Sequence, residues 1–92
     1  MDNQTKIKLG NIEISEPGKI VYDILKYKNS GTVLDLGAGF GRHSLFLAHK
    51  GFIVTAVELV QDKLEKIKEN AKKLDVIMKL HGLKAVVSLT PT

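Results

Sequence analysis

The stretch "TVLDLGAGFGRHS", residues 32–44, decides the fold and raises the question of function. A strand-like run, 32–36, leads into glycines at positions 37, 39 and 41, and a helix-like run follows. Ordering a glycine is costly in chain entropy, so this density indicates a turn at which the backbone must approach something closely. A strand, a glycine-rich turn and a helix N-terminus are together typical of a nucleotide-type site, since free N–H groups and the helix dipole favour anionic groups.

A second part of such a site follows along the chain. The run "FIVTAVEL", residues 52–59, predicts a strand that ends at Glu58. Glu58 lies about 20 residues after Gly37, which is the usual spacing between a glycine loop and its acidic partner. An acidic side chain at this place accepts hydrogen bonds from both hydroxyls of a ribose.

The N-terminal part predicts a hairpin followed by a helix. Residues 6–15 alternate apolar and polar side chains around the turn Gly10-Asn11, which suits a type II′ turn with Ile7, Leu9, Ile12 and Ile14 on one face. A helix is expected over 16–30, capped by Ser15 or Glu16, with an apolar stripe that begins at Ile20. Residues 32–36 read as a strand buried on both faces.

The C-terminal part predicts two helices and leaves one boundary open. Residues 41–50 form a helical pattern, and a second helix begins near Asp62, its expected N-cap. This helix either runs to Gly82 or stops near Leu74, with a strand starting at Val76. The closing "LKAVVSLTPT", residues 83–92, predicts a strand. Strands that alternate with helices predict an α/β fold with a parallel sheet and right-handed crossovers.

Composition excludes several classes of function. A chain of 92 residues accommodates one small domain, and the absence of cysteine excludes disulfides, thiolate zinc sites and cysteine nucleophiles. No signal peptide or membrane-length apolar run is visible, so we expect a cytoplasmic protein without a membrane partner. The net charge of +4 comes from lysines after residue 62, without arginine or aromatic residues among them, so nucleic-acid binding is not predicted. The histidines lack metal-ligand spacing, and no metal site is expected.

Two ligand classes compete for the loop. A dinucleotide site prefers G-x-G-x-x-G, which would place glycine where Arg42 stands. The loop instead carries an acid, Asp35, two residues before Gly37. An acid there suits a ligand with an ammonium group, as in S-adenosylmethionine.

The stretch "VLDLGAGFGRHSLFLAHKGFIVTAVEL", residues 33–59, resembles motif I and the acidic-strand motif of class I S-adenosylmethionine-dependent methyltransferases. Residues 15–75 are most similar to the small methyltransferases of the tellurite-resistance type. The resemblance implies S-adenosylmethionine as cofactor and S-adenosylhomocysteine as product. It also implies a role for each site residue. Asp35 would orient the ammonium group, Glu58 would bind the ribose hydroxyls, and Leu59 would lie against the adenine. The backbone of Gly37, Ala38 and Gly39 would pass close to the cofactor, and Gly41 would begin the helix.

The resemblance implies a three-layer Rossmann-like parallel sheet, of which the chain supplies the strand 3-2-1 side. We expect a single half-domain over 1–92: a hairpin to residue 15, a helix over 16–30, a cofactor-binding core over 31–75 and an atypical segment over 76–92. The strand that borders the methyl acceptor in this family is not supplied, so no catalytic residue is assigned.

Three functional interpretations remain at this point. The first is methyl transfer to a small acceptor. The second is a truncated, non-catalytic half-domain that binds the cofactor weakly or not at all, and the third is a dinucleotide-binding module. In the first two, the open edge of strand 32–36 predicts a homo-oligomer or a swapped dimer. For Arg42 and His43 a surface role is favoured over ligand contact.

Overall fold

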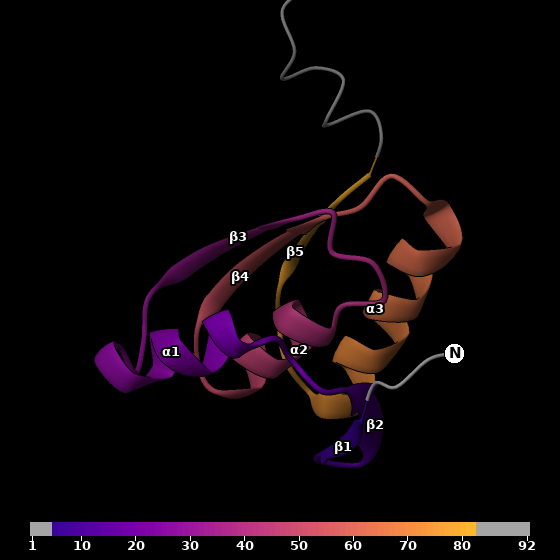
Figure 1. The fold of residues 1–92 in the computed structure, drawn as a ribbon. Helices are drawn as coiled ribbons and strands as arrows, with labels where there is room; N and C mark the ends of the chain where they lie inside the picture. The colour runs from indigo at the N-terminus through magenta and orange to yellow at the C-terminus, as the bar shows by residue number, and fades with distance from the viewer. Residues whose placement is uncertain (1–4, 83–92) are drawn as a thin grey trace, which may run out of the picture.

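Strands and helices alternate along the chain after an N-terminal hairpin, as the sequence predicts. The structure is a computed structural model, and it describes residues 5–82. The elements in chain order are β1 (Lys6–Leu9), β2 (Ile12–Ser15), α1 (Lys19–Tyr27), β3 (Thr32–Leu36), α2 (Arg42–His49), β4 (Ile53–Val57), α3 (Gln61–Leu74) and β5 (Lys79–His81). Figure 1 shows β3, β4 and β5 arching over α1 and α2, with α3 beside them and the hairpin beyond the helices.

The hairpin has the predicted register and turn. Leu9 pairs with Ile12, and Ile7 pairs with Ile14. Gly10 has a φ of +57°, and the φ of Asn11 is not positive, as a type II′ turn requires. An isolated two-stranded hairpin is marginal in water. This one is stabilised by burying its apolar face in the common core with the helices.

The three later strands form a parallel sheet in the order β3-β4-β5. β3 therefore lies at one edge of this sheet, and β4 lies in the middle. This is the 3-2-1 side of a Rossmann-like sheet, and the α/β fold class is confirmed. The predicted strand over 83–92 lies outside the described residues.

Helix α1 begins later than predicted. Its N-cap is Gly18 in an extended conformation without a side-chain cap, so neither Ser15 nor Glu16 caps it. The backbone N–H of Glu16 donates to the carbonyl of Thr5 at 2.8 Å, which continues the extended path of the hairpin past Ser15. Ile20 is 67% exposed, although the apolar stripe predicted it to be buried.

Helix α3 ends at Leu74, which decides between the two predicted boundaries. Asp75 adopts a left-handed conformation with φ +57°. The N–H groups of Asp75 and Val76 donate to the carbonyls of Lys72 and Ala71, in the pattern of a Schellman motif. The start of α3 corrects a prediction: the N-cap is Val60, and Asp62 lies in the first turn.

The sheet has one covered face and one open face among the described residues. Val54 and Ala56 of β4 point toward the helices and are buried with Leu45 and Ile67. On the opposite face Leu34, Leu36 and Ile53 are 61%, 68% and 65% exposed. The expectation that β3 is buried on both faces is therefore wrong for this chain, because the described helices pack on the same side of the sheet.

Candidate functional site

The glycine loop lies over the carboxyl end of the sheet. Gly37, Gly39 and Gly41 have φ values of +69°, +61° and +87°. The N–H groups of Gly37 and Ala38 both donate to the carbonyl of Val57 at 2.9 Å, so the loop crosses from β3 onto the end of β4. Ligands of open α/β sheets bind at this end of the strands.

The three glycines serve two different physical purposes. A Cβ atom added to Gly37 or Gly39 would meet nothing within 4 Å. A Cβ atom added to Gly41 would lie 2.9 Å from Cγ1 of the fully buried Ile67. Gly41 is thus required by the packing of α2 against α3, whereas Gly37 and Gly39 leave an open backbone surface that a ligand can approach.

Glu58 follows β4 directly and holds the loop. Its Oε1 atom accepts a hydrogen bond from the N–H of Gly39 at 2.6 Å, and Oε2 accepts one from the N–H of Val60 at 2.8 Å. The hydrogen bonds from Val60 and Gly39 lower the pKa of Glu58, against an opposing effect of burial. An ionised carboxylate has about four acceptor positions, which is more than the N–H groups of Gly39 and Val60 occupy.

Asp35 is held by a residue that the sequence analysis missed. The Oγ atom of Ser44, which is fully buried in the first turns of α2, donates to Oδ2 of Asp35 at 2.6 Å. This hydrogen bond fixes the carboxylate against the helix start and leaves Oδ1 without a described protein partner. A serine in this position has no signal of its own in the sequence, because its function depends on a contact between β3 and α2.

A cleft of about 560 Å³ opens beside the loop. One wall is the loop and the start of α2, and the other comes from the hairpin and α3. The lining residues are Lys6, Glu13, Ile14, Ser15, Asp35, Gly37, Ala38, Gly39, Phe40, Arg42, His43, Lys66 and Asn70. Arg42 and His43 are half-buried and line this cleft, so a ligand in the cleft could reach them.

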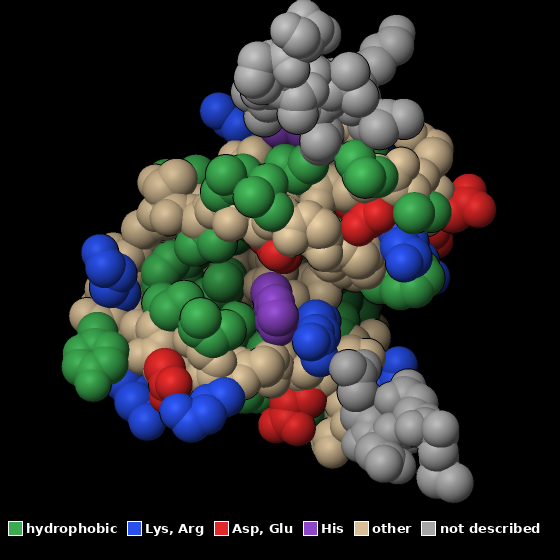
Figure 2. Space-filling model, turned by 45° about the horizontal axis from the view of Figure 1, so that its top comes forward, with side chains coloured by type: hydrophobic (Ala, Val, Ile, Leu, Met, Phe, Trp, Pro, Cys, Tyr) green, Lys and Arg blue, Asp and Glu red, His purple; other side chains and the backbone are tan. Residues whose placement is uncertain are grey.

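Glu58 and Leu59 are not among the residues that line the cleft, although Glu58 is hydrogen-bonded to Gly39, which is. Leu59 is 53% exposed, so it is not a core residue. Phe40 and Val60 are also exposed nearby, and Nζ of Lys63 lies 5.5 Å from the centre of the Phe40 ring. The predicted site residues therefore divide between the cleft, with Asp35, and an exposed apolar surface beside Glu58. Figure 2 shows hydrophobic side chains reaching the surface in several patches on the face turned to the viewer.

Beyond this site, the described residues form a second cavity but no metal cluster and no helix able to span a membrane. Within 5–82, no three His, Cys, Asp or Glu side chains are grouped so that they could hold a metal ion. No helix in this part of the chain is long and apolar enough to cross a membrane. A second hollow of about 480 Å³ lies between α3 and residues 76–80, and it is lined mainly by apolar side chains and lysines.

Comparison with known proteins identifies the family. The family model described as "Tellurite resistance protein TehB" matches residues 9–88. The chain belongs to the TehB family. The resemblance drawn from residues 33–59 is thereby confirmed, and the match extends into the segment after residue 75, which had been expected to depart from the family.

Solved structures show the same fold. TehB from Haemophilus influenzae has a TM-score of 0.73 at 25% identity, covering 82% of this chain and 26% of its own. The tRNA (uracil-54, C5)-methyltransferase of Pyrococcus abyssi, in complex with S-adenosyl-L-homocysteine, has a TM-score of 0.65 at 15% identity, covering 89% of this chain and 24% of its own. The PH0226 protein of Pyrococcus horikoshii has a TM-score of 0.59 at 30% identity, covering 72% of this chain and 30% of its own.

The similarity does not extend to the curated proteins or to the full length of the solved structures. The search of the curated proteins gave no match. The chain spans 26% of the length of the TehB structure that it matches.

Proposed function

We propose that this chain forms the S-adenosylmethionine-binding part of a TehB-family methyltransferase, with residues 31–75 as its core. The observation that carries the proposal is the placement of Glu58 against an open glycine loop. The Glu58 carboxylate lies 2.6 Å from the Gly39 N–H, and a side chain at Gly37 or Gly39 would meet no protein atom within 4 Å. An acid and an open backbone surface at the end of neighbouring parallel strands suit a ribose.

The residues present fit the cofactor on chemical grounds. Asp35, held by Ser44, has a free carboxylate oxygen for an ammonium group. Glu58 retains acceptor positions for the two ribose hydroxyls, and the exposed Leu59 offers an apolar surface to a purine. When bound, S-adenosylmethionine supplies an activated methyl group on its sulfonium. The crystal structure of the Pyrococcus abyssi methyltransferase contains S-adenosyl-L-homocysteine on the same fold, which supports the assignment.

The activity that this site serves is methyl transfer to a small acceptor. No described residue is assigned as catalytic, because methyl transfer requires an acceptor held in line with the sulfonium, and no acceptor-binding wall is identified. The alternative is a non-catalytic half-domain that associates and binds the cofactor weakly or not at all. The sequence lacks cysteine, which fits the reducing cytoplasm as the place of action.

Titration calorimetry with S-adenosylmethionine, S-adenosylhomocysteine and NAD tests the proposal. We expect both adenosyl compounds to bind, and Glu58→Ala to abolish their binding. Binding of NAD alone would favour the dinucleotide-binding alternative. If none of the three ligands binds to the folded wild-type chain, the non-catalytic alternative holds.

We also propose that two copies associate through β3. Its outer edge pairs with no strand among the described residues, and Leu34 and Leu36 are exposed next to it. Unpaired edge groups beside apolar side chains favour the addition of another strand. Light scattering after size exclusion should show a dimer that Leu36→Lys converts to monomer. A wild-type monomer at high micromolar concentration would contradict this proposal.

A further inference from the structure

The first turn of α2 reaches across the cleft to the segment that joins the hairpin to α1. The N–H of Gly18 donates to Nε2 of His43 at 3.0 Å. The guanidinium of Arg42 donates to the carbonyl of Glu16 at 3.2 Å. Two consecutive side chains of α2 therefore hold the two ends of a three-residue segment, 16–18.

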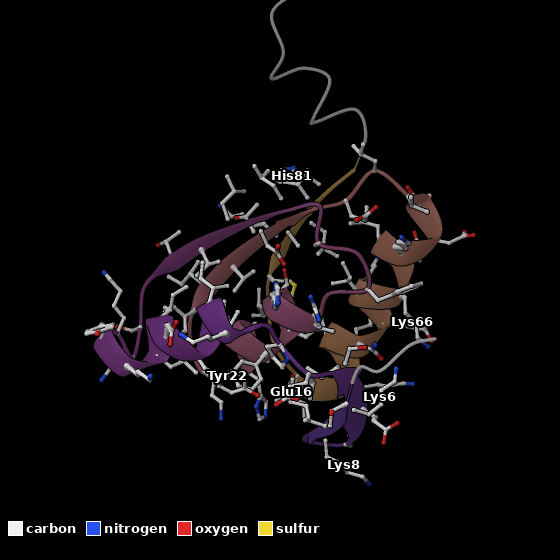
Figure 3. The ribbon with its side chains drawn as sticks, viewed as in Figure 1. Lys6, Lys8, Glu16, Tyr22, Lys66 and His81 are labelled. Carbon is white, nitrogen blue, oxygen red and sulfur yellow. The ribbon has the colours of Figure 1, made fainter. Side chains whose placement is uncertain are left out.

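This segment directly follows one wall of the cleft, although its own residues do not line it. Ile14 and Ser15, which immediately precede it, line the cleft opposite the glycine loop. On its outer side the hydroxyl of Tyr22 donates to a carboxylate oxygen of Glu16 at 3.5 Å, and Figure 3 shows these two side chains next to each other below the sheet. The distance between the hairpin wall and the loop is thus set by contacts between segment 16–18 and the helix start.

We propose that His43 is a positioning residue that holds segment 16–18, and with it the adjoining cleft wall at Ile14 and Ser15, and that it does so only as neutral imidazole. The proposal rests on the proposed function for the identity of the ligand, whereas the contact itself does not depend on that function. Nε2 accepts the Gly18 N–H, so the proton of the neutral ring must be on Nδ1. A protonated ring has only donors, and it would set two N–H groups against each other at this contact.

The surroundings of His43 favour the neutral form. Burial lowers its pKa most, the Arg42 guanidinium lowers it further, and the Asp35 carboxylate partly opposes both effects. The other charged groups on the walls of this cleft are Lys6, Glu13 and Lys66. Because the folded pKa lies below the ordinary value of 6.5, the contact is complete above that pH and is lost as the pH falls through the folded pKa.

Three variants separate this role from a general effect of mutation. His43→Gln keeps an acceptor oxygen at the place of Nε2 but does not titrate, whereas His43→Leu removes the acceptor. His49→Gln, at an exposed position in the last turn of the same helix, is the matched control.

Amide hydrogen exchange at Gly18 without ligand is the first measurement. We expect its protection factor to be constant above pH 6.5 and to fall as the pH is lowered through the folded pKa of His43, in the wild type and in His49→Gln. It should be low at all pH values in His43→Leu, and high and independent of pH in His43→Gln. Equal protection in the wild type and His43→Leu, or the wild-type pH profile in His43→Gln, would overturn the proposal. If His43→Leu does not fold, the difference in pH dependence between the wild type and His43→Gln still tests the proposal.

Binding of S-adenosylhomocysteine at pH 8 is the second measurement. Loss of one hydrogen bond, about 1 kcal/mol, corresponds to roughly fivefold weaker binding in His43→Leu, with recovery in His43→Gln. Unchanged affinity in His43→Leu would overturn the positioning role. If the wild type itself does not bind, the proposed function fails, and the exchange measurement still decides whether His43 holds the segment.

Discussion

At the scale of single residues, the glycines of the loop differ in what a side chain would meet. Gly41→Ala should lower the free energy of unfolding by about 2–4 kcal/mol, because the new methyl would clash with buried Ile67 and the left-handed backbone would be strained. Gly37→Ala should lower the free energy of unfolding by only about 1–2 kcal/mol, because it causes backbone strain without a clash. Urea denaturation of the two variants measures the difference, and equal losses would contradict the distinction.

Ligand binding should be weakened more by Gly37→Ala than by Gly41→Ala. Gly37→Ala places a methyl on the open backbone surface proposed for the cofactor, so it should weaken binding of S-adenosylhomocysteine. Calorimetry of the folded variant tests this prediction. If Gly37→Ala retains wild-type affinity, the cofactor does not pass close to this residue.

Glu58 should make stability depend on pH in the acidic range. Its lowered pKa means that its contribution is complete above the ordinary value of 4.5 and is lost as the pH falls through the folded pKa. At pH 7, Glu58→Gln should cost about 1–3 kcal/mol, because an amide group offers only one acceptor atom to the N–H groups of Gly39 and Val60. Thermal unfolding from pH 3 to pH 7 should show the wild type and the variant converging at low pH. A constant difference would contradict this account.

The sequence predicted the site residues that a local pattern marks. Asp35 and Glu58 each stand at the end of a strand, and the loop glycines lie at fixed spacing between them. The hydrogen bonds of Ser44, Arg42 and His43 could not be predicted, because they join elements that are distant along the chain. A pattern of residue types within one element carries no information about such contacts.

At the scale of elements, the end of α3 can be tested by one substitution. Asp75 has φ +57° in the Schellman turn that ends the helix, a conformation that glycine adopts without strain. Asp75→Gly should therefore raise the free energy of unfolding by about 0.5–1 kcal/mol, and Asp75→Val should lower it. Thermal unfolding measures both changes, and a destabilised Asp75→Gly variant would contradict the assigned turn.

Local signals predicted where most elements lie but not what covers them. The hairpin, β3, α2 and β4 follow from alternation, glycine placement and apolar runs. The exposure of Leu36 and Ile20 could not be predicted, because a strand or helix shows its own apolar positions and not the partner that buries them. The late start of α1 has the same origin, since contacts to Thr5 and His43 extend the chain through residue 18.

At the scale of the whole molecule, the described residues form one layer of helices under a sheet whose other face is exposed. In a Rossmann-like fold, helices cover both faces of the parallel sheet. The glycine loop, Glu58 and segment 16–18 lie on the covered side or at the carboxyl end of the strands. The residues proposed to bind the cofactor all lie within the described part of the chain, so the central claim can be tested on this chain alone.

Mapping of amide chemical shifts during titration with S-adenosylhomocysteine tests that claim most directly. We expect the largest changes at Gly37 and Gly39 in the loop and at Leu59 next to Glu58. Leu64 and Met78, which line the separate hollow between α3 and residues 76–80, should not respond. Saturating changes confined to that hollow, or no changes at millimolar ligand, would contradict the account.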